Sequence, residues 1–214
     1  MTTLVLKRQT QLGQSRFQFS LYNSIYRLIE VILCSLGCVL LVLLIPCIWL
    51  LNRFFAPGPL FYQQQRVGQH GKPFTIFKFR SMVVDAESNG PVWAKNKDAR
   101  VTPIGHFLRR AHIDELPQLW NILCGEMSLI GPRPERPEFV CQLVKEVPDY
   151  DLRHMVRPGL TGWAQVNYGY GSSVDDATIK LDYDLQYVQN RSWRMDMAIL
   201  CRTVWVVFCH TVRG

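Results

Sequence analysis

The stretch VILCSLGCVLLVLLIPCIWLL, residues 31–51, contains no charged residue. An apolar run of this length is typical of a transmembrane helix, because about 20 helical residues cover the hydrocarbon core of a bilayer. A cleaved signal peptide fits poorly, since no small-residue cleavage site follows the run and the polar Asn52 and Arg53 come next. The sequence therefore predicts that this segment attaches the chain to a membrane.

Two features argue against a simple crossing. Pro46 lies inside the run, where a proline removes a backbone donor and kinks or breaks a helix. Basic residues also lie on both sides, so the positive-inside rule selects no orientation. They are Lys7, Arg8, Arg16 and Arg27 before the run and Arg53, Arg66, Lys72, Lys78 and Arg80 after it. A hairpin that enters and leaves the bilayer on one face satisfies both features, and from the residues alone an ordinary span is an equal alternative.

Around this run the pattern alternates between helices and short strands. We expect a loose polar arm over residues 1–20 and a helix from about Leu21 to Pro46, with Arg27 and Glu30 at helical spacing. Residues 60–62 and 74–80 alternate like strands, which places Lys78 and Arg80 on one strand face. Residues 86–100 read as a loop.

The second half of the chain is predicted to be mostly helical. Helices are expected over residues 104–110, from about 112 with Asp114 as N-cap and Pro117 in the first turn, and over 137–146, 178–189 and 195–211. Gly125 is the expected stop of the second helix. Residues 131–134 and 157–163 are rich in glycine and proline and predict loops. The last helix, with Trp205 at its middle, fits either a core or a membrane interface.

Composition narrows the possible partners. The net charge of +7 comes mostly from arginine, which grips phosphate through two hydrogen bonds and also favours anionic lipid surfaces. The seven cysteines form no CxxC pair, which argues for a reducing compartment and against a disulfide framework or zinc site. The five histidines lack metal-ligand spacing. No GxxxxGK[ST] loop and no strand-linked GxGxxG motif is present.

The adjacent acids Asp114 and Glu115 are the strongest candidates for chemistry. Acids at a helix start are often only favourable partners of the helix dipole. Here, however, basic residues surround the pair in the sequence: Lys78, Arg80, Arg109, Arg110, His112 and Arg133, the last between two prolines. A carboxylate can attack phosphorus, a neighbouring carboxylate can help to hold Mg²⁺, and arginines neutralise phosphoryl oxygens. This pattern suits phosphoryl transfer.

Five stretches in order resemble the bacterial sugar transferases, the monotopic polyprenyl-phosphate sugar-1-phosphate transferases. They are PGPLFYQQQRVG (57–68), FTIFKFRSM (74–82), IDELPQLWNIL (113–123), MSLIGPRP (127–134) and VRPGLTGWAQVN (156–167). The resemblance implies that Asp114 attacks the β-phosphate of a UDP-sugar, that UMP leaves, and that undecaprenyl phosphate then takes the sugar-phosphate from the carboxylate. Glu115 would support Mg²⁺ or deprotonate the acceptor. Lys78, Arg80 and Arg133 match family positions expected near the diphosphate, and Arg109 and Arg157 are further candidates for binding substrate. The metal ligands would be Asp114 and Glu115.

The same resemblance implies the organisation of the chain. The expected fold class is α+β, mostly helical, with an N-terminal arm (1–20), a re-entrant helix-break-helix (21–56) and a small cytoplasmic catalytic domain with short strands and interfacial helices (57–214). The protein would lie on the cytoplasmic face of the bacterial inner membrane and contact membrane lipid. A homo-oligomer is possible, and the sequence leaves the oligomeric state open. It would start the assembly of an exopolysaccharide, capsule, O-antigen or glycoprotein glycan. Two departures are Ile45, where many relatives have serine, and Glu30, where many have aspartate.

Three other functions fit less well. A phospholipid headgroup enzyme would need an aspartate-rich metal motif, whereas Asp175-Asp176 stands alone. A catalytically silent lipid-binding scaffold would not need the Asp114-Glu115 pair. A nucleic-acid module agrees with the charge but not with the apolar anchor, so no nucleic-acid partner is expected. Residues 168–184 are the candidate region for reading the sugar, and both hexose and N-acetylhexosamine donors fit.

Overall fold

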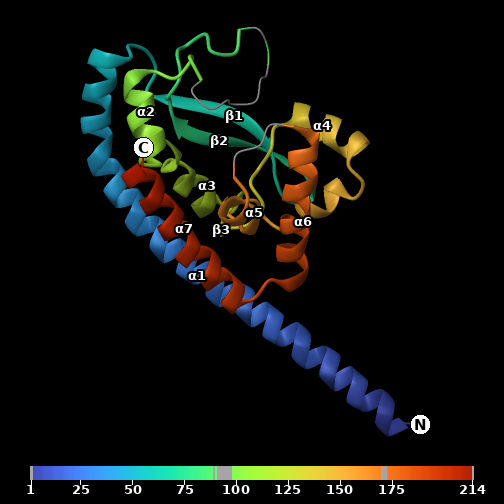
Figure 1. The fold of residues 1–214 in the computed structure, drawn as a ribbon. Coiled ribbons are helices and arrows are strands. Elements are labelled where there is room, and N and C mark those ends of the chain that lie inside the picture. Colours follow the sequence, from blue (N-terminus) through green and yellow to red (C-terminus); the bar gives the residue numbers. More distant parts are fainter. Residues whose placement is uncertain (1, 89, 91–97, 170–172, 214) are drawn as a thin grey trace.

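The computed structural model describes residues 2–88, 90, 98–169 and 173–213, with side chains described between 23 and 207. Its elements are mostly helices, with two small two-stranded sheets (Figure 1). This confirms the mostly helical α+β class. Most of the loop predicted at 86–100, and part of the region 168–184, lie outside the described residues.

Helix α1, Thr2–Phe55, is one continuous α-helix that contains Pro46. The expected loose arm at 1–20 is therefore wrong, because the backbone is helical from Thr2. The expected break at Pro46 is also not found, because α1 continues through this residue. A proline removes one backbone hydrogen bond, and the helix accommodates the loss. In Figure 1 the ribbon of α1 changes direction before its end, in the turns coloured cyan. Within the part Asn23–Phe55, an 18-residue window has a mean hydropathy of 3.0, so by length and composition this part of α1 could cross a membrane. The re-entrant topology of the membrane segment stays a prediction.

One stripe of α1 packs on the rest of the protein and the other faces outward. Tyr26, Cys34, Leu41 and Ile48 are buried at helical spacing, and polar contacts reinforce the packing. The Arg27 guanidinium donates to the Ile122 and Leu123 carbonyls (2.7 and 2.9 Å). The predicted partner of Arg27, Glu30, lies 3.4 Å from it and is buried. The opposite stripe exposes large apolar side chains, among them Leu28, Ile32, Leu36, Val39 and Leu43.

Strands β1 (Phe61–Val67) and β2 (Pro73–Phe79) form an antiparallel hairpin around the short 3-10 helix η1 (Gln69–Gly71). Phe74 and Ile76 of β2 pack with Cys34 of α1 and with helix α3 (Gln118–Cys124). Tyr62 pairs with Lys78 across the hairpin. The strand ends at Phe79, so Arg80 follows the strand and does not share its face with Lys78.

Helix α2 (Pro103–Arg110) leads through His112, which adopts a left-handed conformation with φ 54°, into the 3-10 turn η2 (Ile113–Glu115) and helix α3 (Gln118–Cys124). The predicted helix at 104–110 and the stop at Gly125, with φ 82°, are confirmed. The capping role of Asp114 is wrong. Pro117 occupies the N-cap position of α3, and Asp114 lies one turn earlier, where its side chain is not used as a cap.

Strands β3 (Ser128–Ile130) and β4 (Gly159–Thr161) pair in parallel, so the expected loop at 157–163 contains a short strand. The intervening chain holds α4 (Pro137–Glu146), as predicted, and the 3-10 helix η3 (Tyr150–Met155). Helices α5 (Trp163–Asn167), α6 (Val174–Asn190) and α7 (Trp193–Arg213) complete the fold. Helix α7 begins against α1, with the Trp193 and Tyr26 rings 5.9 Å apart.

Candidate active site

The acid pair lies in η2, the tight turn between α2 and α3, facing the β1–β2 hairpin. Asp114 is 8% exposed and Glu115 is half-buried. The left-handed conformation of His112 separates η2 from the end of α2. Two carboxylates next to each other in a protected turn repel one another unless cations neutralise them.

Glu115 is neutralised by cations from two distant segments. The Lys78 ammonium group of β2 donates to Oε1 at 2.8 Å, and the Arg133 guanidinium donates to both carboxylate oxygens, at 3.3 Å to Oε2. Burial would raise the pKa of Glu115, but Arg133 and Lys78 outweigh it and hold this pKa well below its usual value. Glu115 is therefore a firmly ionised, weakly basic group.

Asp114 has a different environment. Burial and the neighbouring charge of Glu115 raise its pKa, and the attraction of Lys78, Arg109 and Arg133 offsets them only in part. Within the described part of the chain, no hydrogen bond to its carboxylate oxygens is found. A carboxylate that is desolvated, surrounded by cations and not engaged by donors has the properties of a nucleophile toward an anionic phosphate.

The structure brings some of the predicted site residues together and separates others. Lys78 and Arg133 meet at Glu115, and Arg109 lies close to the pair while its Nε donates to Ser81 Oγ (2.8 Å). Arg80 lies elsewhere: its buried guanidinium binds oxygens at the end of α1 and in the loop after it. The acceptors are the Asn52 side chain (3.1 Å) and the carbonyls of Ala56, Pro59 (2.6 Å) and Met82 (3.3 Å).

Arg80 therefore fastens the end of α1 to the hairpin, which explains why a charged side chain is buried there. The side chain of Arg157 is exposed, and its backbone lies beside Gly131. The substrate-binding roles assigned to these arginines stay predictions, and the geometry favours Lys78, Arg109 and Arg133 for contact with phosphate.

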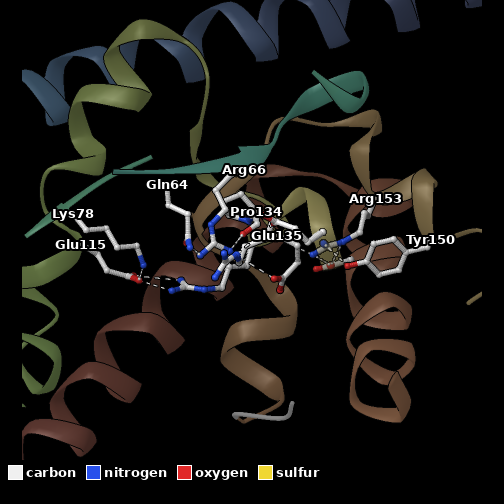
Figure 2. Close-up of polar contacts among 12 residues, drawn as sticks. Gln64, Arg66, Lys78, Glu115, Pro134, Glu135, Tyr150 and Arg153 are labelled. Carbon is white, nitrogen blue, oxygen red and sulfur yellow. Dashed lines mark hydrogen bonds and ion pairs between the residues drawn. The ribbon is translucent and has the colours of Figure 1, made fainter. Parts of the chain in front are cut away.

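A row of polar side chains extends the site beyond the residues that motif reasoning identified. Figure 2 shows it running from Lys78 and Glu115 past Gln64 and Arg66 to Arg153. Arg66 donates to the Pro134 carbonyl (3.0 Å) and, through its other terminal nitrogen, to Gln64 Oε1 (2.5 Å). The alternation of β1 could have indicated Gln64 and Arg66, which share a face. No local pattern marks Arg153.

A divalent cation fits one of the two predicted ligands better than the other. Mg²⁺ usually binds proteins through one or two carboxylates together with substrate phosphates. Asp114 can serve in this way, whereas both oxygens of Glu115 already accept hydrogen bonds from cations. Among the residues described, no group of three or more His, Cys, Asp or Glu side chains forms a ready-made metal site. A metal here would depend on the phosphates of a substrate.

Comparisons with known proteins show the family of the chain. The model of the bacterial sugar transferase family matches residues 21–210. The chain is 47% identical over 154 residues to the UDP-N-acetylgalactosamine-undecaprenyl-phosphate N-acetylgalactosaminephosphotransferase of Aeromonas hydrophila, covering 72% of the chain and 36% of the relative. It is 38% identical over 183 residues to the UDP-glucose:undecaprenyl-phosphate glucose-1-phosphate transferase of Escherichia coli, covering 85% and 39%. The protein of the same name from Caulobacter vibrioides is 38% identical over 180 residues, covering 83% and 67%.

The chain thus spans little more than a third of the first two relatives and two thirds of the third. All three matches cover most of the present chain, and the family match includes the acid pair, the hairpin and the Arg133 loop. The chain belongs to the bacterial sugar transferase family.

Proposed function

We propose that the chain transfers a sugar-1-phosphate from a UDP-sugar to undecaprenyl phosphate and releases UMP. The relatives are named for this type of reaction, with N-acetylgalactosamine or glucose as the sugar. The observation that carries the proposal is the contrast within the acid pair: Asp114 is buried and accepts no hydrogen bond from the residues that the structure describes, while Glu115 accepts hydrogen bonds from Lys78 and Arg133. Such a reaction would begin the assembly of a surface glycan.

In the first step a carboxylate oxygen of Asp114 attacks the β-phosphorus of the UDP-sugar. The bond between this phosphorus and the bridging oxygen breaks, UMP leaves with the bond electrons, and an acyl phosphate to the sugar remains on Asp114. Lys78, Arg109 and Arg133 would neutralise the phosphoryl oxygens as charge spreads over them. Bound Mg²⁺, held by Asp114 and the diphosphate, would supply further charge neutralisation.

In the second step a phosphate oxygen of undecaprenyl phosphate attacks the same phosphorus, and the carboxylate of Asp114 is released unchanged. A phosphate monoester has its second pKa near 6, so the acceptor is already largely dianionic at neutral pH and needs no strong base. The low pKa of Glu115 supports the same division of labour. Glu115 serves chiefly to hold Lys78 and Arg133 in place.

The membrane arrangement belongs to the proposal as well. The outward apolar stripe of α1 would contact lipid, and the catalytic domain would lie on the cytoplasmic face of the inner membrane, where UDP-sugars are made. In the proposed re-entrant topology, α1 enters and leaves the membrane on this face, so both termini share one compartment. Thiol labelling of single cysteines at positions 10 and 212 checks this, and labelling from opposite sides would establish a true span. The sequence allows a homo-oligomer but leaves the oligomeric state open.

Single-turnover experiments test the chemistry. The purified chain in detergent is mixed with a panel of UDP-sugars in the absence of undecaprenyl phosphate, and UMP is measured together with the intact mass. We expect one donor to give a stoichiometric burst of UMP and a mass increase of one sugar-phosphate, which undecaprenyl phosphate then discharges. Asp114→Asn should show neither. UMP release that requires the acceptor, with no mass increase, would contradict the covalent intermediate.

A further inference from the structure

The loop that carries Arg133 is held by its carbonyl groups. Prolines at 132 and 134 have no N–H, so the loop has few donors of its own and is fixed mainly through acceptors. Four consecutive carbonyls, those of residues 132 to 135, each accept a hydrogen bond from outside the loop. The donors, in that order, are the amide of Gly159 (2.9 Å), Nη2 of Arg153 (2.9 Å), Nη1 of Arg66 (3.0 Å) and the amide of Val67 (2.9 Å).

Arg153, which bonds the carbonyl of Arg133 itself, is a fully engaged buried cation. It lies in η3 and is only 6% exposed. Its Nε and Nη2 donate to Asp184 Oδ2 (3.0 and 2.7 Å), and its Nη1 donates to the Tyr150 hydroxyl (3.0 Å). Asp184, on α6, is 2% exposed. A buried ion pair often stabilises a fold no more than well-packed apolar residues of similar volume would. Stability alone therefore does not explain why Arg153 and Asp184 are buried here.

The geometry offers such an explanation. One guanidinium bonds an acid on α6, a phenol on its own element, and the backbone of the residue whose side chain neutralises Glu115. Figure 2 shows Arg153 and Tyr150 at one end of the polar row and Glu115 at the other. The Arg133 side chain is partly exposed and long, so its direction depends on where its backbone is held.

We propose that Arg153, oriented by Asp184, is a positioning residue that fixes the backbone of Arg133 and so aims the Arg133 guanidinium at the reacting phosphate. This inference rests on the proposed function for its kinetic readout. It adds a residue that does not touch substrate but acts through one that does, and it links α6 to the catalytic turn.

A double-mutant cycle separates positioning from a merely structural role. In the full chain in detergent, kcat/KM for the active donor, UDP-N-acetylgalactosamine or UDP-glucose, is measured for Arg153→Lys, Arg133→Lys and the double variant. Lysine keeps the charge but cannot donate to three acceptors in a planar fork. We expect Arg153→Lys to lower kcat/KM by about 10- to 100-fold in the wild-type background, since small misplacements cost this much. In the Arg133→Lys background the further loss should be below about twofold.

Leu181→Ala is the matched control. Leu181 lies on α6 three residues before Asp184 and is buried in the cluster with Tyr150. Its truncation should lower the melting temperature, but any effect on kcat/KM should multiply with that of Arg133→Lys. Multiplicative effects for Arg153→Lys as well would overturn the proposal. Asp184→Asn, which keeps the shape of the side chain, is the second test variant and should repeat the non-additive pattern. If neither Arg153→Lys nor Asp184→Asn folds, the ion pair between Arg153 and Asp184 serves only the stability of the fold, and the proposal is overturned as well.

Hydrogen exchange distinguishes this failure from failure of the proposed function. The amides of Val67 and Gly159, which donate to the carbonyls of residues 135 and 132, should exchange faster in Asp184→Asn than in the wild type or in Leu181→Ala, whether or not the chain releases UMP. Unchanged exchange there would refute the positioning role even in an active enzyme.

Discussion

Replacing each member of the acid pair by its amide should change stability in opposite directions. The charge of Asp114 is unfavourable in the folded state, because burial and Glu115 raise its pKa. An acid whose folded pKa lies above its unfolded value lowers stability at pH 7.5, where it is ionised in both states. Asp114→Asn removes that cost and should stabilise the chain by about 0.5–1 kcal/mol. Turnover should be abolished.

Glu115→Gln should destabilise the folded chain. The amide removes the carboxylate that pairs with Lys78 and Arg133, and breaking a buried ion pair from one side costs about 3–5 kcal/mol. The three side chains keep partial contact with water, so about 2 kcal/mol is a better value here. For a chain of this size, 1 kcal/mol shifts the melting temperature by about 2–4 °C. The two variants should then differ by roughly 5–12 °C.

The assay is thermal unfolding in detergent with EDTA present, so that metal binding does not contribute. Glu138→Gln, a change at an exposed acid in a weak surface pair, is the control and should leave the melting temperature nearly unchanged. A lower melting temperature for Asp114→Asn, or no loss for Glu115→Gln, would refute the assigned electrostatics of the pair.

Three further predictions concern the framework. Arg80→Met should cost about 3 kcal/mol in chemical unfolding, because buried oxygens at the end of α1 lose a charged donor; wild-type stability would show that Arg80 does not fasten α1. Gly131→Ala should cost about 2 kcal/mol, since a Cβ there would lie 2.3 Å from the Arg157 carbonyl oxygen. Gly169→Ala, where no atom of the described residues would lie within 4 Å of the new Cβ, should be neutral. Burial and Arg153 lower the pKa of His154 to about 4. Folding therefore favours the neutral imidazole, and the free energy of unfolding should fall by about 2 kcal/mol as the pH drops from about 6.5 to 4. His154→Gln should flatten that slope in urea titrations.

Features that depend on neighbours in the sequence were predictable. The apolar run at 31–51, the alternation around the hairpin and the glycine stop at residue 125 each reflect interactions within a few positions. Pro137 opens α4 where the sequence placed it, because a proline at the first helical position loses no hydrogen bond. The acid pair and Arg133 were also identified in this way, through short motifs.

The same local rules failed where tertiary contacts compete with them. Pro46 was expected to break the anchor, but one missing hydrogen bond does not end a helix whose other turns continue on both sides. Asp114 was expected to cap α3, yet the left-handed His112 places it in a separate turn. Lys78 and Arg80 were predicted to share one strand face. Because β2 ends at Phe79, Lys78 bonds Glu115 while Arg80 bonds Asn52.

The sequence by itself thus determined that the chain has a long apolar N-terminal helix, a small domain of helices and strands, and an Asp-Glu pair among arginines. Only the tertiary structure decided which cations neutralise Glu115, which arginine fastens the anchor, and that Arg153 and Asp184 support the backbone of Arg133. The physical reason is distance along the chain. A hydrogen bond between residues 31 positions apart leaves no periodic trace in the sequence, because it depends on how separate elements pack and not on the conformation of either one.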